Sequence, residues 1–271
     1  MAEVLQSTFC KFRQAVERDV CEMLSYRWAM LLELLVGAVY IFAAYQIGRN
    51  VLLNGPGKGG YFEYLLVSMC FWAFYNQATT GLLARARHEL LIGTVKAIMC
   101  TRTSLVEFLC YCMVSSCLES TARCAAYLVV AVALFEYDAT QINVLSSAVV
   151  LAMTILSHAP IGLAAAAVLL IIKKGEPMLA VLGTGAMWLL SGGLYPESSL
   201  PHFLQTLASA LPTTHALHAF RAAMVEGASL SALRADLLWL VGFTLVVLPV
   251  THFFSRACLR LARRLGSIDH Y

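Results

Sequence analysis

Long apolar runs separated by short polar segments make up most of the chain. A run of about 20 apolar residues is long enough to cross the hydrocarbon core of a bilayer as an α-helix. Transmembrane β-strands would instead be alternating segments of about ten residues. We therefore predict an all-α membrane protein with six transmembrane helices. The predicted spans cover residues 28–47, 62–83, 109–135, 144–172, 178–195 and 237–254.

Residues 1–27 have a different pattern from the spans. Their apolar residues recur at helical spacing, and their charged residues, Arg18 among them, occupy the other side of the helix. This pattern predicts an amphipathic helix that lies in the membrane surface. Because this polar segment precedes the first span and no small-residue cleavage pattern follows it, we expect the first span to remain in the mature protein.

Composition and charge support this interpretation and orient the chain. Hydrophobic residues make up 60% of the sequence and charged residues 13%, against about 25% charged in a typical soluble domain. With a cytoplasmic N-terminus, the Lys and Arg residues split 14 to 4 in favour of the cytoplasmic segments, and Arg123 lies inside a span. The net charge of +3 therefore indicates topology and not a nucleic-acid partner. We predict a multi-pass protein of a bacterial inner (plasma) membrane, with both termini cytoplasmic and residues 257–271 as a tail.

A proline-punctuated segment follows the fifth predicted span. Residues 200–211 place an apolar face on one side of a short helix, which Pro212 should end. Thr213 or Thr214 is positioned to cap a second helix that runs to residue 227. A single span here would bury several His, Gln and Arg side chains together with two prolines, which is costly in hydrocarbon. We predict an external helical hairpin over about residues 196–230 that dips partly into the outer leaflet.

The most informative polar side chains inside the predicted spans are Glu33, Glu119, Arg123 and His158. A lone charge in hydrocarbon costs several kcal/mol, so such groups are paired or functional. Glu119 and Arg123 are four residues apart and should pair on one helix face, either as a structural pair or as a substrate contact. We expect His158 to be a core histidine beside a kink at Pro160. For Glu33 the alternatives are the membrane interface, the substrate path and, preferred, a contact with a partner subunit.

The sequence shows no complete set of residues for catalysis, for metal binding or for a disulfide framework. The nine cysteines are placed in cytoplasmic segments or spans, so we expect free thiols. His202, His215 and His218 lack a Cys or a neighbouring carboxylate to complete a zinc site, and no metal is predicted. Ser191 has no base placed by sequence to activate it. A GxxxxGK[ST] motif is absent, so ATP is not bound by that route.

Three motifs resemble one family of transporters. They read "ELLIGTVKAIM" at residues 89–99, "GGLYPESSLP" at 192–201 and "LPTTHALHAFRAAMVEG" at 211–227. Together with the N-terminal amphipathic helix and six spans, they resemble the permease subunit of type-2 ATP-binding-cassette (ABC) exporters. The resemblance implies a homodimer, or a dimer with a sister permease, served by two copies of a separate ABC ATPase. The chain itself would be no enzyme and bind no cofactor, because ATP and Mg²⁺ would be bound by the partner.

The resemblance also assigns roles to residues. A cytoplasmic coupling helix over about residues 85–102 would contact the ATPase, and on a helical wheel of residues 89–99 an apolar face lies opposite Glu89, Gly93 and Lys96. The implied coupling residues are Arg18, Arg87, Glu89, Gly93, Thr94 and Lys96. The implied external gate contains Pro196, Pro201, Pro212, His215 and Arg221.

The substrate is the most open of these expectations. An apolar chain with few in-span charges favours a hydrophobic or amphiphilic small molecule, such as a drug, an antibiotic or a lipid. The alternatives are a permease of the same family that exports polysaccharide or glycolipid, and a secondary transporter or channel that works without an ATPase. The missing internal repeat disfavours a secondary transporter.

Overall fold

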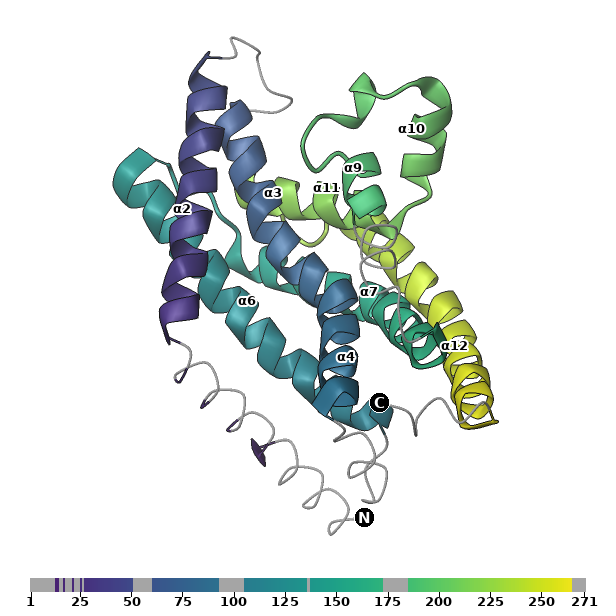
Figure 1. The fold of residues 1–271 in the computed structure, drawn as a ribbon. Coiled ribbons are helices and arrows are strands. Elements are labelled where there is room, and N and C mark those ends of the chain that lie inside the picture. The colour runs from purple at the N-terminus through teal and green to yellow at the C-terminus, as the bar shows by residue number, and fades with distance from the viewer. Residues whose placement is uncertain are drawn as a thin grey trace.

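The computed structural model describes Arg13, Gln14, Glu17, Cys21 and Ser25 and residues 27–50, 60–92, 105–135, 137–172 and 185–264 (Figure 1). Most of these described residues are helical, and none of them forms a β-strand. The long helices are α2 (Arg27–Asn50), α3 (Tyr61–Asn76), α4 (Leu82–Ile92), α6 (Leu105–Phe135), α7 (Val144–Ile172) and α12 (Arg234–Arg264). The shorter elements are η1 (Gln77–Gly81), α9 (Ala186–Leu190), η3 (Glu197–Ser199), α10 (His202–Ser209) and α11 (Pro212–Val225).

Within the described residues, four helices are long and apolar enough to cross a membrane. Their apolar stretches are Leu31–Gly48, Tyr111–Phe135, Val144–Leu169 and Arg234–Ala262. They coincide with the first, third, fourth and sixth predicted spans. Between 17% and 33% of the residues in each stretch are buried inside the chain, so most of their apolar surface is left for lipid or another protein. The prediction of an all-helical fold is thus confirmed for the described residues, and the four apolar helices are compatible with a membrane protein, whereas the six-span arrangement stays a prediction.

The second predicted span is a helix with an irregular turn in it. α3 continues through the π-helical segment η1 into α4, so that residues 61–92 are helical throughout. The hydroxyls of Thr79 and Thr80 donate hydrogen bonds to the carbonyls of Tyr75 (2.9 Å) and Asn76 (3.0 Å) one turn earlier. Gly162 of α7 lies against this segment: a Cβ there would fall 2.6 Å from the carbonyl oxygens of both Ala78 and Thr79. α7 therefore approaches η1 backbone to backbone, as only glycine permits.

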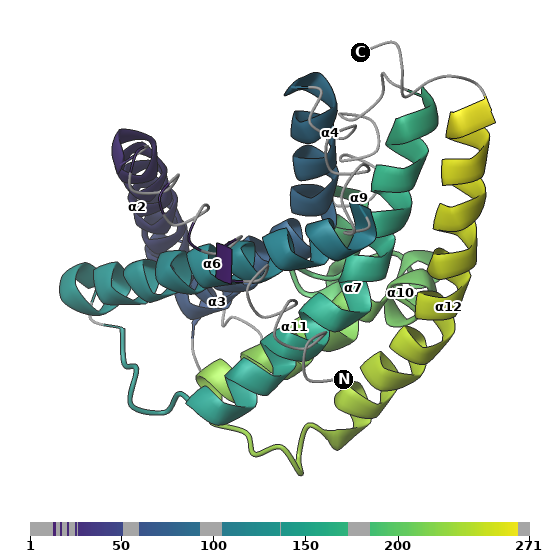
Figure 2. The ribbon, with the colours of Figure 1, turned by 90° about the horizontal axis from the view of Figure 1, so that it is seen from below.

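α6 lies across the other helices. Figure 2 shows α6 passing α2 and α3 at one end and the base of α4 at the other, while α7 and α12 run side by side. Residues 85–92, predicted as the start of a separate cytoplasmic coupling helix, form the end of α4. α12 extends beyond the predicted end of the sixth span, so residues 257–264 of the predicted tail are helical.

Several predictions fall outside the described residues. These are most of the N-terminal amphipathic helix with Arg18, residues 93–102 with Gly93, Thr94 and Lys96, and residues 178–184 of the fifth predicted span. From that span the structure describes α9, which ends in a turn at Ser191.

The main hydrophobic core lies where α3, α7, α9 and α11 meet. Phe71 packs against Trp188 (6.3 Å between ring centroids) and Phe220 (5.9 Å). Ala216, Leu217, Ala219 and Phe220 of α11 are at most 1% exposed. α11 is therefore a core element, whereas α10 projects from the molecule (Figure 1) and leaves Phe203 73% exposed.

Candidate functional site

Arg123 is the centre of a three-residue charge cluster. Its Nη2 lies 2.6 Å from Oε1 of Glu119, one turn earlier on α6, and 2.8 Å from Oε2 of Glu33 on α2. The predicted pair of Glu119 and Arg123 is thus confirmed, and Glu33 joins it within the same chain. Glu33 remains 56% exposed, against 25% for Arg123. Two carboxylates share one guanidinium, so the cluster carries one negative charge in excess.

The cluster borders a cavity of about 640 Å³ between α2, α3, α6 and the segment around α9. This volume is within the usual range of about 300–1,000 Å³ for small-molecule sites. Its lining is mostly apolar and aromatic, and the charged residues in the lining are Glu33 and Arg123. The lining residues include Val36, Gly37, Tyr40, Ala43, Ile47, Leu65, Met69, Trp72, Asn76, Tyr127, Trp188 and Leu194.

Two glycines in this wall are sites of close packing. A Cβ on Gly37 would lie 2.3 Å from Cε1 of Tyr127, so the Tyr127 ring rests directly on the backbone of α2. A Cβ on Gly193 would lie 2.3 Å from Cε2 of Trp188. The ring of Trp188 also contacts that of Trp72, with centroids 4.8 Å apart. The aromatic wall is therefore held by contacts between elements far apart in the sequence.

Arg221 connects α11 to α3 and to the turn after α9. Its Nη2 donates hydrogen bonds to Oγ of Ser68 (2.6 Å) and to the carbonyl of Gly192 (2.7 Å). Its guanidinium carbon lies 3.6 Å from the ring centroid of Tyr64, whose hydroxyl also bonds the Gly192 carbonyl. Gly192 has φ 78°, a conformation that favours glycine. Arg221, predicted as a gate residue, thus fixes this turn.

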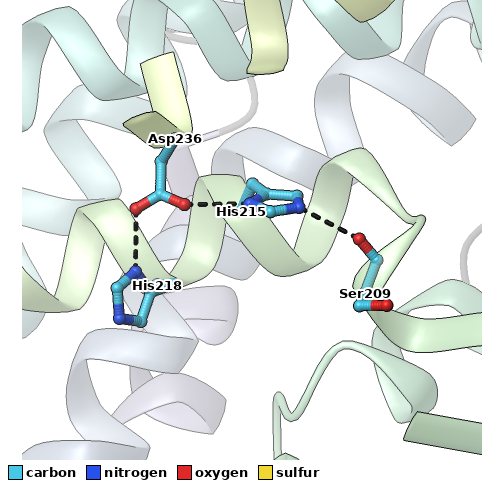
Figure 3. Close-up of polar contacts among 4 residues, drawn as sticks. All are labelled: Ser209, His215, His218 and Asp236. Carbon is cyan, nitrogen blue, oxygen red and sulfur yellow. Dashed lines mark hydrogen bonds and ion pairs between the residues drawn. The ribbon is translucent and has the colours of Figure 1, made fainter. Parts of the chain in front are cut away.

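His215 and His218 both contact Asp236 at the start of α12, as Figure 3 shows. Oδ1 of Asp236 lies 2.9 Å from Nδ1 of His215, and Oδ2 lies 2.8 Å from Nδ1 of His218. Nε2 of His215 lies 3.0 Å from the Ser209 carbonyl, so both nitrogens of that ring face hydrogen-bond acceptors. The hydrogen bond to Asp236 raises the pKa of His218 against the opposing effect of burial. This His–Asp cluster joins α10, α11 and α12.

The sequence pattern singled out the two histidines but not their carboxylate partner, Asp236. Asp236 lies 18 residues after His218, but an acidic residue in the first turn of a helix was a readable signal. His202, the third histidine considered as a ligand, is exposed on α10. In the described ranges no three His, Cys, Asp or Glu side chains are arranged to hold a metal ion.

His158 is fully buried in α7, where it was expected as a core histidine. Its Nδ1 donates to the Thr154 carbonyl at 2.8 Å, which leaves Nε2 to accept from the Thr213 hydroxyl at 3.1 Å. The prediction that Thr213 or Thr214 caps α11 is wrong. Leu211 is the N-cap and Pro212 occupies the first turn, so the Thr213 hydroxyl is directed to His158 and not to the helix end.

The remaining predicted site residues are placed separately. Pro196 precedes η3, and Pro201 precedes α10. Near the end of α4, Arg87 is exposed, whereas Glu89 is only 7% exposed. Arg87 is therefore the better placed of the two to contact another protein.

No protein-family model matches the chain, and no curated protein matches it.

Proposed function

We propose that the chain is the membrane-spanning permease subunit of an ABC exporter for a hydrophobic or amphiphilic small molecule. The observation that carries the proposal is the cavity of about 640 Å³, which combines an apolar, aromatic wall with a charge cluster. An apolar cavity with few polar groups suits a small organic molecule, because a polysaccharide would leave most of its hydroxyls without partners.

In this proposal two permeases form a dimer in an inner (plasma) membrane, and two separate ATPase subunits bind ATP and Mg²⁺. The cytoplasmic end of α4 and the residues after it are the proposed coupling segment. Movement of α4 would reach the cavity along one continuous path, because α4, η1 and α3 form a single helical stretch. Arg221 and the His–Asp cluster would hold the opposite, external end together.

Co-purification tests the proposal directly. The tagged chain, expressed in its native host and extracted in mild detergent, is expected to carry an ATPase subunit in equal amount. The purified complex should hydrolyse ATP, and reconstituted vesicles should accumulate substrate only with ATP. Full transport by this chain alone, without ATP, would overturn the proposal in favour of a secondary transporter or channel.

A charge reversal locates the coupling contact. Arg87→Glu is expected to reduce substrate-stimulated ATP hydrolysis at least tenfold. The substitution puts a negative charge at the exposed end of α4, which would repel an acidic contact surface on the ATPase. Arg256→Glu, at an exposed position on α12, is the matched control. Equal ATPase rates in the two variants would contradict a coupling role for Arg87.

A further inference from the structure

We infer that the cavity binds an amphiphilic organic cation and that Glu33 is the group that meets its positive charge. The role of this site in transport rests on the proposed function, whereas binding itself does not. The inference is drawn from the charge balance of the cluster, the distribution of polar groups along the cavity and the composition of the wall.

The charge balance favours a cation. Arg123 is shared by Glu33 and Glu119, which leaves one negative charge uncompensated beside apolar surface. An uncompensated charge in such surroundings is costly, and a monocationic ligand would restore neutrality. Glu33 contacts Arg123 through Oε2 and keeps 56% of its side chain exposed, so it can accept a second partner without losing the first.

The charged groups of the lining, Glu33 and Arg123, lie at one end of the cavity. Ser120 of α6 bonds the Ala73 carbonyl of α3 (3.3 Å), which puts the Ala73 turn at the level of Glu119 and Arg123. Towards the other end, Ala44 of α2 packs with Leu65 of α3. A ligand with a charged head and an apolar body therefore has one matching orientation.

The wall between these ends is aromatic. Tyr40, Trp72, Tyr127 and Trp188 contribute rings from α2, α3, α6 and α9. Aromatic faces attract organic cations and repel anions. An anionic amphiphile of the same shape would face both these rings and the excess carboxylate, and would bind more weakly.

A pair of ions with matched shape tests the inference. The purified full chain in nanodiscs of zwitterionic lipid is titrated with radiolabelled tetraphenylphosphonium, and separately with tetraphenylborate, which has the same shape and the opposite charge. We expect tetraphenylphosphonium to bind at least tenfold more tightly. Glu33→Gln should weaken its binding at least tenfold and remove the preference for the cation.

Two further variants separate charge from folding. Glu226→Gln removes an exposed carboxylate at the end of α11, outside the cavity lining, and should leave binding unchanged. Ala43→Phe fills the cavity from an exposed position on α2 and should abolish binding of both ions while the protein elutes as before from a sizing column.

Three outcomes would overturn the inference: equal affinity for both ions, unchanged affinity in Glu33→Gln, or unchanged affinity in Ala43→Phe. These results are independent of the ATPase. If the cation binds as expected but no ATPase co-purifies, the exporter proposal fails and the binding site stands. If an ATPase co-purifies and drives transport but the cation does not bind, the substrate class is wrong.

Discussion

The carbonyl oxygen of Thr79 faces Gly162 so closely that a Cβ on Gly162 would fall only 2.6 Å from that oxygen. The contact pairs an irregular turn in one helix with a glycine in the next. Because backbone is on both sides, neither can move aside by changing a rotamer. This contact sets the distance between α7 and the stretch formed by α3, η1 and α4.

Gly162→Ala should therefore be destabilising. We expect it to reduce the free energy of unfolding by about 1–3 kcal/mol, the usual cost of inserting a methyl group into a packed interface. The measurement is the thermal unfolding midpoint of the protein in nanodiscs. Gly242→Ala is the control, because a Cβ there meets nothing within 4 Å. Alanine favours a helix by roughly 0.5–1 kcal/mol over glycine, so the control should be neutral or stabilising. A destabilisation of the same size in both variants would contradict the contact.

Removing Arg123 should cost more than removing either of its acidic partners. Arg123→Gln leaves two carboxylates facing each other beside the cavity, and we expect a loss of about 1–3 kcal/mol, below the cost for a fully buried pair because solvent reaches the cluster. The double variant Glu33→Gln, Arg123→Gln should recover part of the loss, since one of the repelling charges is gone. Additive effects in this double-mutant cycle would show that Glu33 and Arg123 do not interact.

The His–Asp cluster should make stability depend on pH. The pKa of His218 is raised above its ordinary value of 6.5, first by the hydrogen bond to Asp236, with further attraction from Glu197 and Glu226. Its contribution is therefore fully present below pH 6.5 and is lost as the pH rises through the raised pKa.

We expect the unfolding midpoint to fall as the pH is raised above 6.5, and the fall to be smaller in His218→Gln. The control is His202→Gln, on the exposed surface of α10, which should keep the pH dependence of the unchanged protein. Identical pH profiles for the His218 variant and the unchanged protein would rule out this contribution. The effect should be modest, because the His218 side chain is 71% exposed.

Arg221→Leu should loosen the turn after α9. The substitution removes the hydrogen bonds to Ser68 and the Gly192 carbonyl and leaves the latter to Tyr64 alone. We expect amide hydrogen exchange in residues 191–195 to accelerate at least tenfold, measured by mass spectrometry. Arg234→Leu, at an exposed site on α12, should leave that exchange unchanged. Slow exchange in the Arg221 variant would mean that other contacts hold the turn.

The sequence predicted those features that depend on one helix at a time. Four spans followed from the length of apolar runs, and the contact between Glu119 and Arg123 followed from their spacing on α6. The addition of Glu33 could not be predicted, because it depends on where α2 crosses α6. Asp236 was missed for the same reason: its histidine partners lie on a different helix.

The segments that broke simple patterns were harder to predict. The apolar run over residues 62–83 contains no sequence signal for the π-helical turn, whose Thr79 and Thr80 would also fit an α-helix. The motif "LPTTH" offered both a proline and two threonines as helix-start signals. Pro212 occupies the first turn of α11. The Thr213 hydroxyl bonds to His158, which lies more than 50 residues earlier in the chain.

The π-helical turn of η1 also sets the rotational orientation of α4, which continues the same helical stretch. A π turn holds one residue more than an α turn, and each α-helical residue advances the chain by about 100° and 1.5 Å. Removing a single residue between Gln77 and Gly81 would swing the whole of α4 through about a quarter turn. The Arg87 side chain, which is exposed, would then point in a different direction.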